Sequence, residues 1–116
     1  MTIPAFAIRI VHSGPATHIH PAGELDIATT PALEQAIVAA TTERGAALVL
    51  DLRELTFMDS TGLRALAQAN ARAGDSGIAL SIIRGPRQIE RVLEISGLGA
   101  MLPLVDAPPE SDAPAA

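Results

Sequence analysis

The stretch ALVLDLRELTFMDSTGLRALAQA, residues 47–69, contains the strand-to-helix turn around which the rest of the chain is arranged. Its first four residues, Ala47–Leu50, form the short apolar run that is typical of a buried strand. Polar residues end that run, and Leu55–Met58 then carries the chain over the edge of the sheet. The cluster Asp59–Gly62 is rich in capping residues and is followed by apolar residues at helical spacing, which predicts a helix that begins near Ser60.

The predicted start of this helix places Ser60 where negative charge is favoured. Unpaired backbone N–H groups and the helix dipole both point toward an anion at the N-terminus of a helix. A hydroxyl group at this position is therefore well placed to carry a phosphate. Either Ser60 or Asp59 could cap the helix, and the Ser60 hydroxyl stays free if Asp59 does so.

Length and composition limit the possible classes of protein. At 116 residues the chain is long enough for one domain with a single core, and two phenylalanines with no tyrosine or tryptophan leave that core aliphatic. The net charge of −5 argues against nucleic acid or an anionic membrane surface as a partner. The absence of cysteine excludes disulfides, thiolate metal sites and a cysteine nucleophile.

The sequence has no visible signal peptide or membrane span. Its N-terminus lacks a basic region followed by an apolar one, and no apolar run approaches the ~18 residues that span a bilayer. We therefore expect a soluble cytoplasmic protein with no membrane partner. The negative net charge and the lack of an obvious exposed apolar stripe favour a monomer.

The N-terminal part of the chain predicts a β-hairpin followed by a helix. Phe6–Val11 alternates as a half-buried strand does, and Thr17–Gly23 forms a second strand after a Ser-Gly-Pro turn. Pro21 cannot donate to a strand ladder, which predicts a bulge, an edge position or an early end of that strand. A helix capped by Thr30 follows and ends at Gly45.

Helices and strands alternate over the remainder of the chain. Glycines at 74 and 77 are expected to end the helix that begins near Ser60. A strand at Ile78–Ile83 and a helix that Gly85–Pro86 opens and Gly97 ends are expected next. The last expected elements are a helical turn at Leu98–Leu102 and a strand at Leu104–Val105. This order predicts a single-domain α/β fold with a mixed, mostly parallel sheet of four to five strands and helices packed on it. We expect the domain to span residues 1–105 and the Ala- and Pro-rich residues 106–116 to form a disordered tail.

Ser60 does not have the surroundings of a hydrolase nucleophile. The Gly-x-Ser-x-Gly elbow needs a glycine two residues before the serine, where this chain has Met58. His12, His18 and His20 lie on the early strands, and nothing in the sequence places one of them beside the serine. Two histidines on one strand face without a third ligand are weak support for a metal site, so we expect surface or edge-strand histidines. With no phosphate-binding loop either, we expect no catalytic residue, no metal and no cofactor.

Polar residues recur every four residues along the helix that begins at Ser60. Arg64, Gln68 and Arg72 share one face with Ser60, whereas the apolar residues lie toward the sheet. An ordinary solvated helix face has the same pattern. For Gln68 and Arg72 the sequence therefore leaves partner binding and simple solvation equally open.

The chain contains four segments in this order: GELD (residues 23–26), LDL (residues 50–52), FMDSTGL (residues 57–63) and RVLEISGL (residues 91–98). In these segments and their order it resembles the STAS family, and most closely its stand-alone bacterial anti-sigma factor antagonists. The resemblance runs over nearly the whole chain, from about Phe6 to Val105, and the DSTGL segment with its upstream strand is the most specific part. It implies the same α/β fold.

The resemblance also implies a phosphorylation switch. In that family the serine directly after the motif aspartate is phosphorylated by a partner kinase that is itself the anti-sigma factor, and the corresponding residue here is Ser60. The loop at residues 23–26 corresponds to another part of the family's partner-binding surface. The residues expected to contact an anti-sigma factor serine kinase are therefore Glu24, Asp26, Asp59, Ser60, Thr61, Gly62, Arg64 and Gln68. Arg64 departs from the family, in which small residues are common at this position.

The function implied by the resemblance is that of an anti-sigma factor antagonist. Such a protein binds the kinase while Ser60 is unphosphorylated, releases the sigma factor, and is switched off by phosphorylation; a serine phosphatase would reset the site. Two alternatives stay open. One is a cytoplasmic subunit of a lipid or anion transport system that binds a transporter ATPase, and the other is a scaffold subunit of a large stress-signalling assembly.

Overall fold

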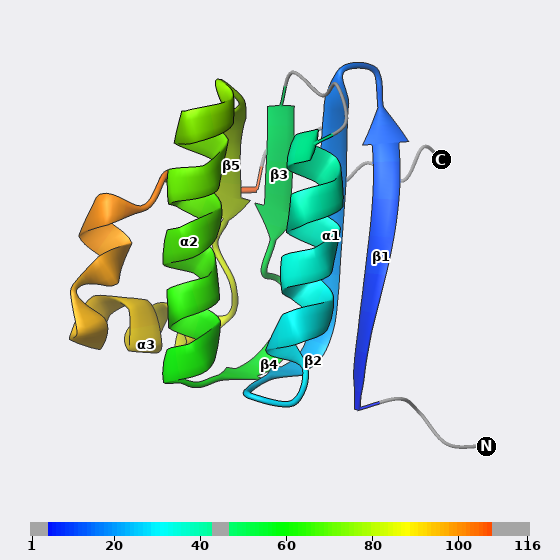
Figure 1. Cartoon of the computed structure of the whole chain (residues 1–116). Helices are drawn as coiled ribbons and strands as arrows, with labels where there is room; N and C mark the ends of the chain where they lie inside the picture. Colours follow the sequence, from blue (N-terminus) through cyan, green and yellow to red (C-terminus); the bar gives the residue numbers. More distant parts are fainter. Residues whose placement is uncertain (1–4, 43–46, 108–116) are drawn as a thin grey trace.

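The computed structural model describes residues 5–42 and 47–107, which form a sheet with helices packed on it (Figure 1). The elements in chain order are β1 (Phe6–Ser13), β2 (Ala16–Leu25), α1 (Thr30–Thr42), β3 (Ala47–Asp51), β4 (Leu55–Met58), α2 (Ser60–Ser76), β5 (Ala79–Ile83), α3 (Arg87–Ser96), the 3₁₀ helix η1 (Leu98–Met101) and β6 (Leu104–Val105). The strands lie in the order β1-β2-β3-β5-β6, and β4 also pairs with β2. Only β1 and β2 are antiparallel among the described pairings. The predicted α/β fold with a mixed, mostly parallel sheet is confirmed.

The strand before Ser60 is divided into two in the structure. Both β3 and β4 pair in parallel with β2, because Leu50 lies opposite Ile19 and Leu55 lies opposite Gly23. A turn at residues 52–54 separates the two strands. The sheet therefore has six strands, and the prediction of four to five was too low, because Leu55–Met58 forms a strand of its own and does not merely carry the chain over the edge of the sheet.

Pro21 lies inside β2, which continues past it to Leu25. The neighbouring strand is interrupted at the same level, since Ile19 is the last residue of β2 in register with β3 and Gly23 the first in register with β4. A missing N–H group is tolerated where the ladder on one side is already broken. The predictions of an edge position and of an early strand end are therefore wrong, and the register shift in the pairing of β2 with β4 falls beyond the proline, between Gly23 and Glu24.

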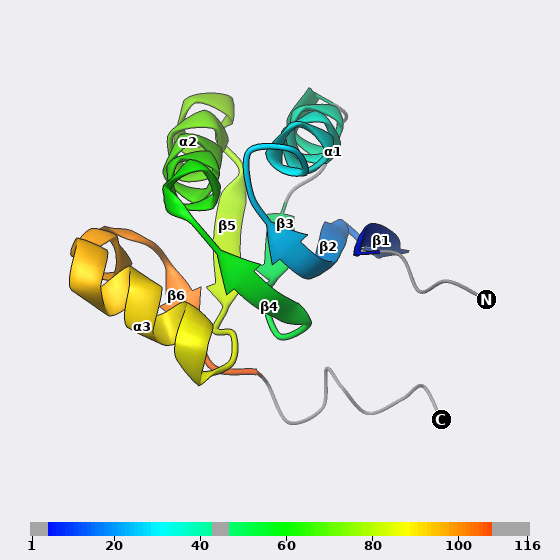
Figure 2. The same ribbon diagram turned by 90° about the horizontal axis from the view of Figure 1, so that it is seen from below.

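Helices α1 and α2 cover one face of the sheet, and α3 packs against β4 and η1 near the opposite end of the strand order from β1 (Figure 2). The core beneath α1 and α2 is aliphatic, as the composition predicts; its fully buried residues include Ile19, Leu33, Leu50, Leu66 and Ile82. The other face of the β1–β2–β3 part of the sheet has neither α1 nor α2 on it (Figure 2).

Two helices end at glycine, as the sequence predicts. Gly77 follows α2 with a φ of 69° and Gly97 follows α3 with a φ of 77°, a left-handed conformation that glycine adopts without a steric penalty. Gly45, which is predicted to end α1, lies outside the described residues, and so do residues 108–116 of the predicted tail. Within the described ranges, no helix is both long and apolar enough to cross a membrane.

Candidate partner-binding site

Ser60 is exposed at the junction between a parallel strand and the helix that follows it. Strand β4 ends at Met58, and Ser60 is the first residue of α2. The position that the sequence predicts for this side chain, outside the core and at the positive end of a helix, is therefore confirmed.

Asp59, and not Ser60, caps the helix. Its Oδ1 accepts hydrogen bonds from the backbone N–H of Thr61 at 2.9 Å and of Gly62 at 3.2 Å, and a third from the Thr61 hydroxyl. The Thr61 hydroxyl bond, followed by the backbone bonds, holds the pKa of Asp59 below its ordinary value. Within the described part of the chain, no residue is hydrogen bonded to the Ser60 hydroxyl. The cap therefore leaves this hydroxyl available for chemistry.

Gly62 brings the first turn of α2 close against the core. A Cβ atom added at this position would lie 2.6 Å from Cγ of Met58 and 3.0 Å from Cδ2 of Leu25. The backbone N–H of Asp59 also donates to the carbonyl of Leu25 at 3.2 Å. The start of α2 is thus fixed directly to the end of β2, and the role of Gly62 at the site is to permit this close approach.

The loop after β2 lies at the same end of the molecule as Ser60 (Figures 1 and 2). Gly23 has a φ of 105°, and a Cβ atom there would lie 2.0 Å from the carbonyl oxygen of Ala5, so glycine is required. The side chain of Glu24 is exposed, and this residue pairs with Phe57 of β4. Oδ1 of Asp26 accepts bonds from the N–H groups of Ala28 and Thr29 and so shapes the loop internally.

The exposed strip on α2 runs from Ser60 through Arg64 to Gln68. Arg72, on the same face, donates from Nε to the hydroxyl of Thr41 at 2.6 Å and so joins α2 to α1. Its role is therefore contact between the two helices. Arg64 makes no ion pair within the described residues, so its guanidinium is free to meet a new negative charge.

Two large apolar residues at this end of the molecule are exposed, which was not predicted from the sequence. Ile27 lies in the loop after β2 and Phe57 lies in β4, and both are among the exposed large apolar side chains. A large apolar side chain in DIATT, whose other residues are small or polar, is the sequence signal that could have identified the first of them. Phe57 was predicted to lie at the edge of the sheet, and the sequence there does not distinguish an exposed side chain from a buried one.

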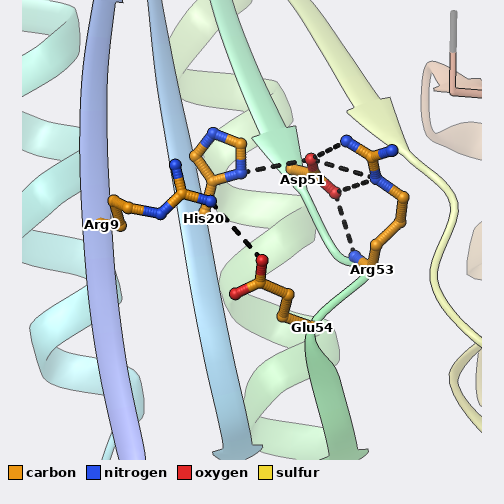
Figure 3. A network of polar contacts seen from close by, with 5 residues as sticks. All are labelled: Arg9, His20, Asp51, Arg53 and Glu54. Atoms are coloured by element: carbon orange, nitrogen blue, oxygen red, sulfur yellow. Dashed lines mark hydrogen bonds and ion pairs between the residues drawn. The ribbon is translucent and has the colours of Figure 1, made fainter. Parts of the chain in front are cut away.

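A separate polar network lies on the sheet face turned away from α1 and α2 (Figure 3). Asp51 at the end of β3 is only 3% exposed, and its carboxylate accepts bonds from the backbone N–H of Arg53 at 3.0 Å and from Nε of the same residue at 2.9 Å. Nδ1 of His20 lies 3.2 Å from Oδ2 of Asp51. At the margin of this network, Arg9 and Glu54 form an exposed ion pair of 3.5 Å.

Burial and charge act in opposite directions on the pKa values of this network. Burial alone raises the pKa of Asp51, but the hydrogen bonds and the charge of Arg53 outweigh it and bring that pKa below its ordinary value. Burial, reinforced by the charge of Arg9, lowers the pKa of His20, against the attraction of Asp51 and Glu54. These residues were not predicted to form a site, and the network stabilises the turn between β3 and β4.

The three histidines do not converge on Ser60. The rings of His18 and His20 are stacked with centroids 6.2 Å apart on the β2 strand, and Nδ1 of His12 lies 3.4 Å from the Thr17 hydroxyl. Among the described residues, no three His, Cys, Asp or Glu side chains lie together in a way that could hold a metal ion. Ser60 accordingly has no catalytic histidine hydrogen bonded to it.

Comparison with known proteins agrees with this arrangement. A family model described as "Mlab, STAS domain" matches residues 8–105. The anti-sigma-F factor antagonist RsfB of Mycobacterium tuberculosis is 33% identical over 76 residues, which cover 66% of this chain but only 62% of RsfB. The chain therefore spans less than two thirds of the length of that relative.

Solved structures of the same kind have similar folds. The structure of an anti-sigma factor antagonist from Mycobacterium paratuberculosis is 28% identical, covers 92% of each chain and superposes with a TM-score of 0.81. SpoIIAA of Bacillus has been solved in unphosphorylated and phosphorylated forms, with TM-scores of 0.76 and 0.70. The two forms cover 90% of this chain and 91% and 95% of SpoIIAA, and at 20% identity they show likeness of fold alone.

Proposed function

The chain belongs to the STAS-domain family, and from this premise we propose that it is an anti-sigma factor antagonist that binds its anti-sigma factor through the surface around Ser60. The observation that carries the proposal is the exposed Ser60 at the start of α2, whose hydroxyl is left free because Asp59 takes the cap. The similarity to RsfB and to the antagonist from Mycobacterium paratuberculosis supports the class of partner.

The second part of the proposal is that the anti-sigma factor is a serine kinase whose substrate is Ser60. In this reaction the Ser60 oxygen attacks the γ-phosphorus of ATP, ADP leaves, and the hydroxyl proton passes to a base on the kinase. The chain contributes an accessible nucleophile and no catalytic group of its own. This step places the protein in the cytoplasm with the kinase, and a serine phosphatase reverses it.

The fold tolerates a phosphate at Ser60 in the free protein. The side chain points into solvent, so the new charge does not have to be buried. Arg64 lies one helical turn further along the same face, at the spacing at which side chains on a helix meet. A charge-assisted bond from its guanidinium would partly offset the repulsion between the phosphate and the neighbouring Asp59 carboxylate.

The complex tolerates the same phosphate poorly. A phosphoserine carries about −1.5 to −2 charges at neutral pH, and here it would add to the negative charge of Asp59 at the centre of the contact. Burying unpaired or like charges in an interface costs several kcal/mol. At 1.4 kcal/mol for each factor of ten, a penalty of ~4 kcal/mol weakens binding about a thousandfold. Phosphorylation therefore releases the partner without requiring a change of fold.

Phosphorylation assays with purified proteins test this proposal. Each anti-sigma factor kinase encoded in the source genome is incubated with ATP and this protein, and tandem mass spectrometry locates any phosphate. We expect one kinase to add a single phosphate to Ser60, and the Ser60→Ala protein to stay unmodified. An unchanged mass with every kinase, or a phosphate on another residue, would contradict the proposal and favour the transport-subunit alternative.

A further inference from the structure

Ile27 is a highly exposed apolar residue in a loop that is closed by hydrogen bonds. It retains 77% of its accessible surface, about as much as Ile95 on α3 at 76%, whereas Val38 on α1 retains 43%. Single exposed apolar residues are common on protein surfaces and need no explanation by themselves. Two further features separate Ile27 from an ordinary exposed residue: the hydrogen bonds that close its loop and the attachment of that loop to the start of α2.

The loop that carries Ile27 is closed on both sides of the residue by hydrogen bonds. On the C-terminal side, Oδ1 of Asp26 accepts from the N–H groups of Ala28 at 2.9 Å and Thr29 at 3.1 Å, and the Thr29 hydroxyl donates to the carbonyl of Glu24 at 2.8 Å. On the N-terminal side, the N–H of Asp26 donates back to the Thr29 hydroxyl at 2.9 Å. The backbone at Ile27 is therefore held in place before any partner binds.

The same loop is joined to the start of α2. The N–H of Asp59 donates to the carbonyl of Leu25, two residues before Ile27, and Gly62 packs against the Leu25 side chain. Both views of the ribbon place the loop after β2 beside the first turn of α2 (Figures 1 and 2). A protein that covers Ser60 therefore also reaches Ile27.

We propose that Ile27 is the apolar anchor of the interface with the anti-sigma factor and inserts into an apolar pocket on that protein. This inference rests on the proposed function and adds a division of roles to it. A fixed backbone reduces the conformational entropy that is lost when the side chain is buried, which is how preorganised residues gain affinity. Fully buried apolar anchors commonly dominate the energetics of an interface, whereas the residues around them contribute little individually.

The two residues then have different functions in the interface. Ile27 supplies binding energy in every step that involves the complex, because its side chain takes no part in the transfer of the phosphoryl group. Ser60 decides whether the complex forms, because its phosphate cannot be buried. Loss of uniform binding energy raises KM and leaves kcat unchanged. The Ile27→Ala protein should therefore be a poorer substrate for the kinase through KM alone.

Ile95 provides a matched control for Ile27. It is the same residue type and is 76% exposed, but it lies near the C-terminal end of α3, outside the surface around Ser60. Ile27→Ala and Ile95→Ala remove the same atoms from equally solvated positions, so both variants should keep the thermal stability of the unsubstituted protein. A shared melting temperature establishes that any difference in binding comes from the interface.

The experiment measures the dissociation constant of each variant with the kinase that phosphorylates Ser60, in the presence of ADP, and then the steady-state kinetics of phosphorylation. We expect Ile27→Ala to weaken binding about 30-fold and to raise KM with kcat unchanged, and Ile95→Ala to change both values less than threefold. Equal effects of the two substitutions, with the Ser60 switch intact, would overturn the anchor role alone. Failure of the unsubstituted protein to bind or to be phosphorylated would overturn the proposed function itself.

Discussion

Thr61 is bound to Asp59 through two groups, since both its backbone N–H and its hydroxyl donate to the Asp59 carboxylate. The residue between them, Ser60, takes no part in this cap. The first turn of α2 is therefore stabilised without the side chain that we propose to be modified. On the proposed function, this separation would allow a phosphate to be added and removed while the helix stays folded.

Removal of the cap should destabilise the protein modestly. We expect Asp59→Ala to lower the free energy of unfolding by about 1 kcal/mol, because two N–H groups of α2 lose their acceptor. Asn is about as good a capping residue as Asp, so Asp59→Asn should retain most of the stability. Urea denaturation measures both values, and equal losses in the two variants would show that the carboxylate charge, and not the cap, is responsible.

Gly62 should not tolerate a side chain, whereas another glycine of the same helix should. Gly62→Ala places a Cβ atom against Met58 and Leu25, and overpacking of this kind costs about 1–3 kcal/mol. A Cβ atom at Gly74 meets nothing within 4 Å, so Gly74→Ala should stabilise α2 by about 0.5–1 kcal/mol. Thermal denaturation of both variants checks the sign of each effect, and a stable Gly62→Ala protein would refute the close approach.

Asp51 should make folding sensitive to acid at low pH. Its pKa in the folded protein lies below the ordinary value of 3.8, so its contribution to stability is complete above that pH and is lost as the pH falls through the folded pKa. We expect Asp51→Asn to lower the free energy of unfolding by about 2 kcal/mol at neutral pH, because the bonds from Arg53 lose their charged acceptor.

Chemical denaturation of Asp51→Asn and the unsubstituted protein over a pH series tests this linkage. The difference between the two should shrink as the pH falls below 3.8, because the unsubstituted carboxyl is then also neutral. A difference that stays constant down to the lowest pH would show that the bonds from Arg53 stabilise the protein without any contribution from the carboxylate charge.

His20 should make the stability of the fold depend on pH in a higher range than Asp51 does. Its pKa in the folded protein lies below the ordinary value of 6.5, so the unfolded chain takes up a proton first as the pH falls. Stability should be constant above that value and decline as the pH falls from 6.5 toward the folded pKa, where protonation of the folded state ends the loss. The His20→Gln protein should lack this decline, and denaturation midpoints measured between pH 5 and pH 8 for both proteins test this. A decline of the same size in the variant would show that His20 is not its cause.

The sequence predicts most of the fold because local patterns determine most of its elements. The apolar run before Asp51, the glycines after α2 and α3, and the capping cluster at residues 59–62 each have a local physical meaning. The division of one strand into β3 and β4 could not be predicted in this way. It depends on the pairing of both segments with β2, which is a contact between distant parts of the chain.

The sequence predicts where Ser60 lies in the fold, but only some of the contacts around it. The sequence left open whether Asp59 or Ser60 forms the cap, because both residue types are suited to it, and the geometry at the end of β4 decides for Asp59. The network of His20, Asp51 and Arg53 was not predicted, since it needs the register of two strands. The exposure of Ile27 likewise depends on hydrogen bonds around Asp26 that a sequence pattern does not reveal.

The binding of the kinase to protein with and without a phosphate on Ser60 tests the central claim most directly. Isothermal titration calorimetry is carried out with the unmodified protein, the enzymatically phosphorylated protein and the Ser60→Ala and Ser60→Asp variants. We predict that the unmodified and Ser60→Ala proteins bind alike, that the phosphate weakens binding about a thousandfold, and that Ser60→Asp also binds poorly. Equal affinity of the phosphorylated and unphosphorylated proteins would contradict the account.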